Sequence, residues 1–348
     1  MSTLYNRIKA FEKLGILFSN KFTENSSKGS EYWTSELDKA IDLAYKYNTW
    51  FTKDSVKKAL NEWSKQLNYN SLKNWTDQYK IEDKSEKKIA IIMAGNLPLV
   101  GFHDLLCGLI MNFHCIVKLS SDDKILIPFI VEYLDSIVPG IKNQVKFTTN
   151  PIKNFNGVIA TGNNNSFKYF EYYFGNYPNL LRKTRHSIAV LDGKETEMDL
   201  KKLGNDIFTY FGMGCRSVSK LLVPKGYDFD LLFNALFDFK EIINHNKYVN
   251  NYDYNKAVYL MSEQKFIENG FIILKEDEKL GSPIGCLFFE YYENPKDLNA
   301  YISDIKDSLQ CVVSNLNILN STSFGSSQSP KIDDYADNIN TLDFLLKI

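Results

Sequence analysis

The chain has 348 residues, of which 44% are hydrophobic, 14% aromatic and 24% charged. This composition is typical of a globular protein long enough for two domains, and it argues against intrinsic disorder. With a formal net charge of -1, the chain lacks the overall field that attracts nucleic acid or an anionic membrane, so we expect neither partner. The five cysteines are dispersed and odd in number, which favours reduced thiols in the cytoplasm over a disulfide framework.

We expect no signal peptide, membrane span or metal site. The first residues have a charged helical pattern without an apolar core region. The longest apolar stretch, 105–119, is interrupted by Asn112, His114 and Lys118, and it is too short and too polar to cross a bilayer. Only four histidines are present, and no cysteine or histidine cluster has zinc-ligand spacing. A cytoplasmic protein without a metal is therefore expected.

The first 80 residues are expected to form a layer of helices. Apolar residues recur at helical spacing over 4–14, 37–44 and 56–63, the last after a cap near Thr52. The four tryptophans all lie on or beside these apolar faces: Trp33, Trp50, Trp63 and Trp75. We expect these side chains to anchor the packing of the helices rather than to contact a ligand.

From residue 89 onward, apolar β-rich runs alternate with helical patterns. The expected strands are 89–94, 115–120, 145–149, 157–161, 187–191, 217–223, 271–276 and 286–292. The expected helices are 98–113, 123–138, 165–177, 199–211 and 228–239. This alternation predicts parallel α/β sheets with helices on both faces. The acidic, glycine-containing segment 192–199 is a candidate domain boundary.

Three of the expected strand ends carry small, polar or basic residues at the edge where α/β sheets collect ligands. These residues are Gly95 and Asn96, then Lys118, then Thr161, Gly162 and Asn163. Each strand end alone is more often an ordinary turn and helix cap. The chain has no G-x-G-x-x-G fingerprint and no P-loop.

One cysteine stands at the junction between a helical pattern and a strand pattern, in the sequence GMGC at 212–215. Gly212 and Gly214 remove side chains near the Cys215 sulfur, which lets a substrate approach it closely. Arg216 next to it favours the thiolate. Because most cysteines are small buried residues, these features leave a catalytic role and a core role equally open.

The residues around this cysteine, YFGMGCRSVSKLLVPKGYDF, resemble the cysteine motif of the LuxC-type acyl-CoA reductases, a branch of the aldehyde dehydrogenase superfamily. GNLPL, CIVKLSS, IATGN and EKLGSPIG resemble the superfamily's WNFPL, VVLKPSE, FTGS and EIFGPVLP, and SFGSSQSP resembles the LuxC-type C-terminal signature. The motifs follow the superfamily's order over residues 88–345. The resemblance implies that Cys215 is the nucleophile and that Asn96 supports the oxyanion. The cofactor contacts that it implies are Lys118, Thr161, Gly162, Asn163 and Glu278.

One departure from the superfamily pattern favours a reduction. Where the superfamily's LELGGK carries a Glu that activates water, this chain has Arg182, Lys183, Arg185 and His186. A reductase benefits from the loss of that base, because hydrolysis would waste the acyl-enzyme. The basic segment itself is expected to be an exposed turn, with binding of CoA phosphates as the alternative.

A second departure concerns the cofactor. Ser121 stands where NAD-preferring members of the superfamily have Glu. Losing a carboxylate there makes room for a 2′-phosphate, which favours NADPH over NADH. The carboxylates of Asp122 and Asp123 stand close by and weaken this inference.

The resemblance implies an aldehyde dehydrogenase-like α/β fold, with two α/β domains and an N-terminal helical section. The expected division is 1–192 for the helices and the nucleotide-binding domain, 193–318 for the catalytic domain, and 319–348 for a segment returning to the first domain. The implied activity is NADPH-dependent reduction of an acyl thioester, such as acyl-CoA, to an aldehyde through an acyl-cysteine. Relatives usually form dimers or larger assemblies, but the usual pairing hairpin is not evident in the sequence, so a homo-oligomer stays open.

Two other functions stay open on the sequence alone. A cysteine acyltransferase or thioesterase would use Cys215 with His186 or His103 and would need no nicotinamide. A non-catalytic binding subunit with the same fold would lack a fast-reacting thiol. Neither composition nor motifs select an acyl chain length.

Overall fold

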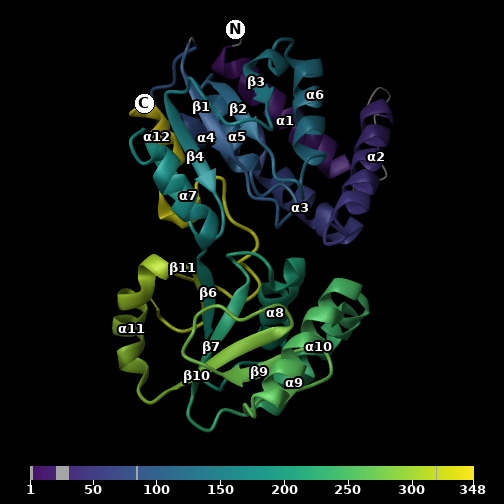
Figure 1. Cartoon of the computed structure of the whole chain (residues 1–348), viewed down its shortest axis with the longest axis vertical. Coiled ribbons are helices and arrows are strands. Elements are labelled where there is room, and N and C mark those ends of the chain that lie inside the picture. The colour runs from purple at the N-terminus through teal and green to yellow at the C-terminus, as the bar shows by residue number, and fades with distance from the viewer. Residues whose placement is uncertain (1–2, 21–30, 84, 319) are drawn as a thin grey trace. The chain divides into compact units, whose positions relative to one another are not determined.

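The computed structural model describes residues 3–20, 31–83, 85–318 and 320–348. The chain divides into two compact units, one formed by Met1–Lys183 with Lys331–Ile348 and the other by Thr184–Pro330 (Figure 1). The boundary falls before the expected residue 192, because strand β6 (His186–Val190) pairs with strands of the second unit. The return to the first unit falls at residue 331 rather than at the expected 319.

In the described part of the first unit, five parallel strands form a sheet in the order β3-β2-β1-β4-β5. The strands are β1 (Lys88–Ile92), β2 (His114–Lys118), β3 (Val145–Phe147), β4 (Gly157–Thr161) and β5 (Asn179–Arg182). The centre of β1 is fully buried and entirely apolar, as expected for a parallel strand covered on both faces. The chain moves from β1 toward β3 and then returns to β4 on the other side of β1. In open α/β sheets, ligands bind at the carboxyl ends of the strands beside such a reversal, here β1 and β4, and we call this part of the sheet the crevice edge.

Helices cover both faces of this sheet. Helices α5 (Phe102–Ile110) and α6 (Leu126–Ile137) make the successive crossovers from β1 to β3 and share one face. Helix α7 (Asn164–Phe174) packs on β4 and β5, and phenylalanines cover the small residues of β1 and β4 on that side. Helix α12 (Thr341–Leu346), near the C-terminus, packs against α5.

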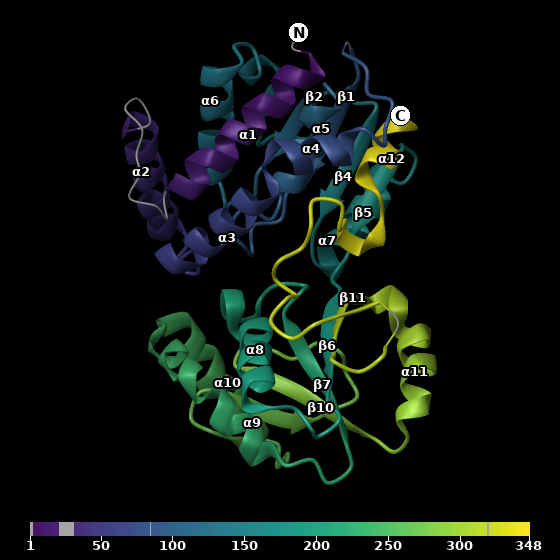
Figure 2. The ribbon, with the colours of Figure 1, turned by 180° about the vertical axis from the view of Figure 1, so that it is seen from behind.

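The expected layer of N-terminal helices is confirmed (Figure 2). It consists of α1 (Leu4–Asn20), α2 (Glu31–Tyr47), α3 (Lys53–Gln66) and α4 (Tyr69–Thr76). Helix α1 packs on α5 and α6, and α2 packs on α6. Trp75 is buried, and the other three tryptophans pack against the core of this unit. The interpretation of the tryptophans as packing anchors is therefore confirmed.

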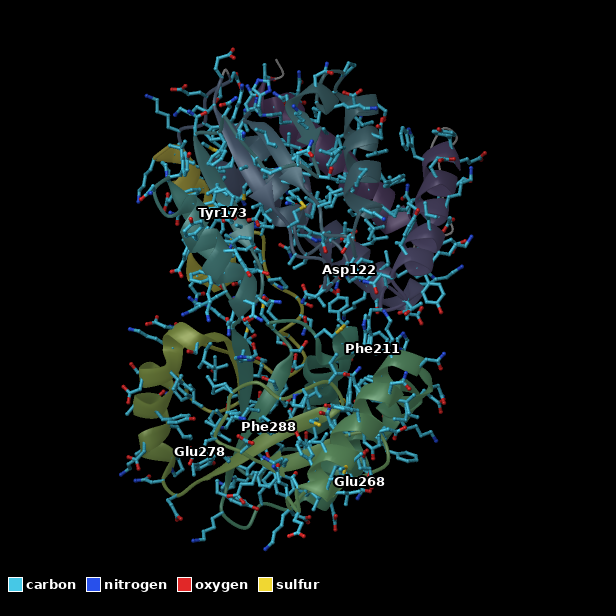
Figure 3. The ribbon with its side chains drawn as sticks, viewed as in Figure 1. Asp122, Tyr173, Phe211, Glu268, Glu278 and Phe288 are labelled. Atoms are coloured by element: carbon cyan, nitrogen blue, oxygen red, sulfur yellow. The ribbon has the colours of Figure 1, made fainter. Side chains whose placement is uncertain are left out.

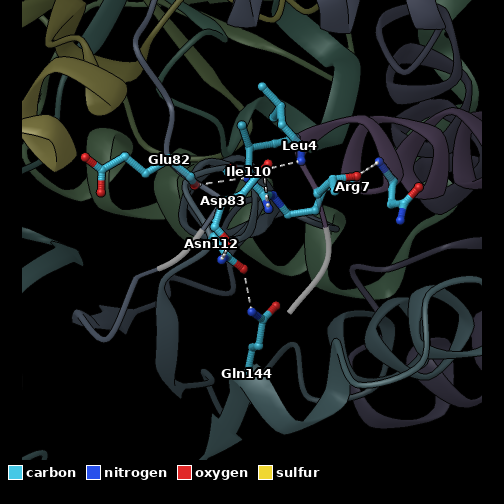
Figure 4. Close-up of polar contacts among 9 residues, drawn as sticks. Leu4, Arg7, Glu82, Asp83, Ile110, Asn112 and Gln144 are labelled. Carbon is cyan, nitrogen blue, oxygen red and sulfur yellow. Dashed lines mark hydrogen bonds and ion pairs between the residues drawn. The ribbon is translucent and has the colours of Figure 1, made fainter.

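A buried arginine ties α1 to the rest of the unit (Figure 4). Arg7 is 1% exposed, and its Nε donates to the carbonyl oxygen of Ile110 at 3.1 Å. Its guanidinium lies 3.6 Å from the Asp83 carboxylate. The carbonyl oxygen of Asp83 accepts from Asn112 Nδ2 at 2.7 Å, and Asn112 Oδ1 accepts from Gln144 Nε2 at 2.6 Å. These bonds join the first helix to the amino-terminal edge of the sheet.

In the second unit, the described residues form a seven-stranded sheet in the order β12-β11-β6-β7-β10-β9-β8. The strands besides β6 are β7 (Val218–Pro224), β8 (Ile267–Glu268), β9 (Ile273–Glu276), β10 (Cys286–Tyr292), β11 (Leu309–Val313) and β12 (Ser321–Thr322). All pairs are parallel except β8 with β9. The helices are α8 (Glu197–Phe208), α9 (Phe229–Leu236), α10 (Asn246–Met261) and α11 (Leu298–Ile305). Two apolar clusters, one under α8 and α9 and one under α11, cover the sheet on both faces.

Two helix ends differ from the sequence prediction because of left-handed backbone. The helix expected from residue 98 begins at Phe102, since Leu99 has a φ of 61°. The helix expected to reach residue 211 ends at Phe208, since Tyr210 and Phe211 have φ values of 55° and 59°. Such values are incompatible with a right-handed helix. Strands β5 and β11 and helices α10 and α11 were not predicted.

Among the helices that the structure describes, none combines the length and the apolar character needed to cross a membrane. In the same part of the chain, no group of three or more His, Cys, Asp or Glu side chains is arranged to hold a metal ion.

Candidate active site

The residues predicted at three strand ends of the first unit lie at one edge of its sheet. Lys118 ends β2, Thr161 ends β4, and Asn96 follows β1 at the start of the next loop. Because β2, β1 and β4 are parallel neighbours, their carboxyl ends meet at the same edge. The structure thus brings Asn96, Lys118, Thr161, Gly162 and Asn163 to the crevice edge; the role of each stays a prediction.

The turn after β4 has the features of a phosphate cradle. Asn163 caps helix α7, with its Oδ1 accepting from the backbone N–H of Ser166 at 2.9 Å. A Cβ on Gly162 would lie 2.8 Å from Ser166 Cβ and 2.9 Å from Phe170 Cε2, so only glycine fits. The first N–H groups of a helix are unpaired and carry a positive partial charge, which suits an anion. The turn is therefore suited to an anion, and its contact with a pyrophosphate stays a prediction.

The loops after β1 and β2 pack tightly against each other. A Cβ on Gly95 would lie 2.5 Å from Ser120 Cβ, so this close approach requires glycine. The backbone N–H of Leu99 donates to Asp123 Oδ2 at 3.1 Å. Asp123 is 5% exposed, and burial raises the pKa of its carboxyl to about 6. The buried Asp123 side chain therefore stabilises the loop after β1 through its bond to Leu99.

The residues relevant to the cofactor's 2′ position lie in the loop after β2. Ser121 and Asp122 are both exposed, and the Ser121 hydroxyl lies 3.5 Å from Asp122 Oδ1. Asp122 is labelled in Figure 3. Asp123 is buried, as described above. Of the two aspartates that weaken the preference for NADPH, only Asp122 is therefore accessible to a ribose.

In the second unit, Cys215 lies on a strained loop between α8 and β7. Three consecutive residues of this loop, Tyr210, Phe211 and Gly212, have φ values of 55°, 59° and 75°. Left-handed backbone costs about 1–2 kcal/mol for a residue other than glycine, so bulky aromatics adopt it only when the surroundings impose it. The centroid of the Phe211 ring lies 4.4 Å from that of the His245 ring. Such strain clusters at functional sites, which favours a functional role for this loop.

The backbone around Cys215 is fixed by hydroxyl groups. Gly214 N–H donates to Ser217 Oγ at 3.2 Å, and Ser217 N–H donates to the Gly214 carbonyl oxygen at 2.9 Å. The Ser187 hydroxyl, from β6, donates to the Cys215 carbonyl oxygen at 2.8 Å. The peptide groups on both sides of Cys215 are thus held in place, while the Cys215 residue is exposed.

The five cysteines differ strongly in accessibility. Cys107, Cys115 and Cys286 are buried, and burial raises the pKa of the Cys115 and Cys286 thiols to about 12 and that of Cys107 well above its ordinary value. Cys311 is half-buried and lies 3.1 Å from a guanidinium nitrogen of Arg216. Of the five cysteines, all of which lie in the described part of the chain, only Cys215 is exposed. A thiol that must reach a substrate is therefore best matched by Cys215.

The basic segment 182–186, which begins at the last residue of β5, is not the uniform exposed turn that the sequence predicted. Arg182 is 4% exposed, and its Nη1 lies 2.6 Å from Asp104 Oδ2 in a buried ion pair. Its Nη2 donates to Thr341 Oγ1 at 3.0 Å. Lys183 is exposed. Because the Arg182 guanidinium is buried and paired with Asp104 in the first unit, it cannot bind CoA phosphates.

The two histidines considered as bases for a thioesterase lie in packed surroundings. A Cβ on Gly281 would lie 2.2 Å from His186 Cε1, so the imidazole packs directly on that glycine, and burial lowers the pKa of His186. His103 Nε2 lies 2.8 Å from the Ile332 carbonyl oxygen, and its Nδ1 lies 4.0 Å from Cys107 Sγ. Both ring nitrogens of His103 thus have partners in the interior of the first unit.

The loop that carries Glu278 is anchored by a buried lysine that the sequence analysis missed. Glu278 is exposed (Figure 3), and its carbonyl oxygen accepts from Lys220 Nζ at 2.8 Å. Lys220 is 0% exposed and also pairs with Glu290. The Ser219 hydroxyl donates to the Leu280 carbonyl oxygen at 2.8 Å. The sequence feature that could have identified Lys220 is its position within the otherwise largely apolar strand β7.

Comparison with known proteins places this geometry within a known fold. No family model matches the sequence, and no curated protein matches it. Aldehyde dehydrogenase 21 from Physcomitrella patens, in complex with the reaction product succinate, matches 99% of this chain and 84% of its own, with a TM-score of 0.67 and 11% identity. The indole-3-acetaldehyde dehydrogenase AldA from P. syringae, in complex with NAD+ and IAA, matches 95% of this chain and 75% of its own, with a TM-score of 0.65 and 12% identity.

A third solved structure agrees with these two. The Delta-pyrroline-5-carboxylate dehydrogenase from Mycobacterium tuberculosis matches 91% of this chain and 67% of its own, with a TM-score of 0.59 and 13% identity. The chain therefore has the aldehyde dehydrogenase-like α/β fold that the sequence predicted. At these identities the likeness concerns the fold, and the chemistry has to be argued from this chain's own residues.

Proposed function

We propose that the chain is a nicotinamide-dependent acyl-thioester reductase of the LuxC type, which converts an acyl-CoA to an aldehyde through a thioester on Cys215. The observation that carries this proposal is the exposed Cys215 on a strained, glycine-flanked loop in a chain with an aldehyde dehydrogenase-like fold. A covalent acyl carrier needs an accessible sulfur whose surrounding backbone is held in position.

The first unit supplies the groups that suit the cofactor, which would provide the hydride. The helix α7 N-terminus and Gly162 fit the pyrophosphate, and Lys118 would contact the adenosine ribose. In the second unit, Glu278 would contact the nicotinamide ribose. Ser121 leaves room for a 2′-phosphate, which supports NADPH, whereas the accessible carboxylate of Asp122 favours NADH. The ratio of the two dissociation constants measures this preference directly.

The proposed reaction begins at the cysteine. The Cys215 thiolate attacks the thioester carbonyl carbon, the bond from that carbon to the CoA sulfur breaks, and CoA leaves as a thiolate that takes a proton from water. The Cys215 backbone N–H would stabilise the intermediate oxyanion, where one donor is worth roughly 3 kcal/mol, and the resemblance implies the same role for the Asn96 amide. The acyl carbon then accepts the hydride. Finally, its bond to Cys215 breaks, which releases the aldehyde and restores the thiolate.

Reduction is favoured over aldehyde oxidation by the residues of β5, β6 and the turn between them. Residues 179–191 contain no Asp or Glu, so this segment supplies no carboxylate to activate water. Arg182 in the same segment is committed to its ion pair with Asp104. An acyl-enzyme without a hydrolytic base survives long enough to accept a hydride.

The test is NADPH consumption with a series of thioesters from acetyl-CoA to palmitoyl-CoA. Cys215→Ala should reduce turnover by at least about a thousandfold while leaving NADPH binding, followed by fluorescence, unchanged. Cys311→Ala is the matched control and should keep most of the activity. If Cys215→Ala retains most of the wild-type rate, the proposal is wrong.

CoA release in the same assay and the rate of cysteine alkylation separate the two other functions. Release of CoA without nicotinamide oxidation would indicate a thioesterase or acyltransferase. A Cys215 that reacts with iodoacetamide no faster than the other thiols would indicate a non-catalytic binding subunit.

A further inference from the structure

The two ends of the Cys215 loop are both hydrogen-bonded to one distant segment of the same unit, Gly325–Gln328. This segment belongs to the SFGSSQSP motif, to which the proposed reaction assigns no role. We call it the C-terminal clamp. The inference below rests on the proposed function only in that Cys215 is taken as the reacting group.

On the helix side of the loop, the clamp is bonded to a buried aspartate. Asp206, near the end of α8, is 0% exposed. Its Oδ2 accepts from Gly325 N–H at 2.6 Å, and its Oδ1 accepts from Ser327 N–H at 3.0 Å and from the Ser327 hydroxyl at 2.7 Å. Bonds from neutral donors to a buried carboxylate are among the stronger hydrogen bonds in proteins. The end of α8 is therefore firmly attached to the clamp.

On the strand side, the clamp reaches the residue that orients the Cys215 backbone. Gln328 Nε2 donates to Ser217 Oγ at 3.1 Å, and the same oxygen accepts from Gly214 N–H at 3.2 Å. Gln328 is 8% exposed and Ser217 is 1% exposed. The amide of Gln328 thus fixes the hydroxyl that accepts from the Met213–Gly214 peptide group, one residue before Cys215.

A clamp at both ends explains how the loop keeps its unusual backbone. Tyr210 and Phe211 are held at positive φ, and backbone in this region persists only when the surroundings over-determine it. Within the loop, Met213 N–H donates to the Tyr210 carbonyl oxygen at 3.1 Å. The bonds of Asp206 and Gln328 to the clamp supply long-range restraint at the two places where the loop begins and ends.

We propose that Gln328 and Ser217 are positioning residues for Cys215, so that the C-terminal clamp sets the place of the sulfur without touching the substrate. Reaction rates depend steeply on such placement, and a displacement of 1 Å can cost on the order of 100-fold. Substrate binding does not depend on it in the same way. The clamp should therefore act on kcat and much less on KM.

The primary test is Gln328→Ala, assayed for reduction of the acyl-CoA that the wild-type enzyme uses best. We expect kcat to fall about tenfold, by partial displacement of the sulfur, with KM changed less than about threefold. Gln144→Ala is the matched control. Gln144 is also a buried glutamine, 9% exposed, whose amide donates to one side chain, Asn112, in the first unit (Figure 4). It should lower the melting temperature to a similar extent and leave kcat unchanged.

A double-mutant cycle identifies the bond through which Gln328 acts. Ser217→Ala removes the hydroxyl that accepts from Gln328 and from Gly214. If both residues position Cys215 through that hydroxyl, the double variant should be no slower than the slower single variant. Effects on kcat that multiply would show that the two residues act independently and would overturn the proposal.

Alkylation of Cys215 tests the positioning role of Gln328 independently of the proposed reductase activity. The rate constant for alkylation of Cys215 by iodoacetamide, followed by mass spectrometry, reports on the loop without any turnover. It should differ by more than about threefold between wild type and Gln328→Ala and stay unchanged in Gln144→Ala. Failure of the proposed function would appear as reductase activity that survives Cys215→Ala. Failure of the positioning role would appear as wild-type alkylation and wild-type kcat in Gln328→Ala.

Discussion

The crevice edge of the first unit and the Cys215 loop of the second are held in place in different ways. At the crevice edge, the restraints are mostly local: Asn163 caps the helix that it begins, and Gly162 fits against Ser166 of that helix. The Cys215 loop depends on residues far away in the sequence, namely Ser187, Ser327 and Gln328. The first arrangement can be formed by a strand, a turn and a helix, whereas the second requires that the whole unit be folded.

This difference indicates how each region should respond to mutation. A substitution at the crevice edge should damage that edge alone, because few distant residues depend on it. A substitution in the support of the Cys215 loop should act at a distance, as proposed for Gln328. The experiments below test this contrast.

The largest expected effect is that of Gly162→Val on cofactor binding. The new side chain would collide with Ser166 and Phe170 and displace the turn at the α7 N-terminus. Losing one hydrogen bond from backbone N–H to a phosphate costs about 2–3 kcal/mol, which corresponds to about 100-fold in affinity. Fluorescence titration with NADPH measures this loss. Alkylation of Cys215 should stay within twofold of wild type, and a larger change would contradict the local character of the crevice edge.

The control for this variant is a glycine with a similar steric conflict elsewhere in the same unit. A Cβ on Gly108 would lie 2.8 Å from Cys115 Sγ, near the start of β2 and thus at the opposite edge of the sheet. Gly108→Ala should lower the melting temperature but leave the affinity for NADPH within threefold. Equal losses of affinity in both variants would mean that general destabilisation, rather than the turn at Gly162, is responsible.

The second-largest expected effect is that of removing Lys220, which holds the Glu278 backbone from a distant position in the sequence. Lys220→Met removes the charged donor to the Glu278 carbonyl oxygen, and such a bond contributes about 1.5 kcal/mol, or about tenfold. We expect KM for NADPH to rise by about that factor with little change in kcat. Stability should change little, because the Glu290 side chain is 35% exposed and keeps its hydration. Lys256→Met is the control, since it breaks the pair with Glu268 in the same unit and should leave KM unchanged.

The local and long-range regions also differ in how well the sequence predicted them. The strand ends at Asn96, Lys118 and Thr161 were found because a buried strand followed by Gly, Asn or Ser has a recognisable pattern. The approximate position of the Cys215 loop was found in the same way. The residues that hold the loop in place were not found. A bond between residues more than 100 positions apart, such as that from Gln328 to Ser217, leaves no periodic signal in the sequence.

Two further misses have equally physical reasons. The helix expected from residue 98 begins later because Leu99 adopts positive φ, which glycine usually marks and leucine does not. Arg182 was expected in an exposed turn because arginine is rarely buried without a partner. Its partner, Asp104, lies 78 residues away and could not be inferred from the sequence around Arg182.

The smallest expected effect lies at the long-range bond of the crevice edge, between Asp123 and Leu99. Burial raises the pKa of Asp123 to about 6, above the ordinary value of about 3.9. Between these two values the folded state binds more protons than the unfolded state, so stability falls as pH rises from about 4 to about 6 and then levels off. Asp123→Asn removes this titration and keeps an oxygen that can accept from Leu99.

Urea denaturation at pH 4.5 and pH 7 measures this difference. Relative to the variant, the wild-type free energy of unfolding should fall by about 2 kcal/mol between the two pH values. The Cys215 alkylation rate should be equal in both proteins, because Asp123 supports only the first unit's loops. A parallel pH dependence of the two proteins would mean that Asp123 is ionised in the fold. In that case, the loops after β1 and β2 would enclose an ionised Asp123 carboxylate that has no cationic partner among the described residues.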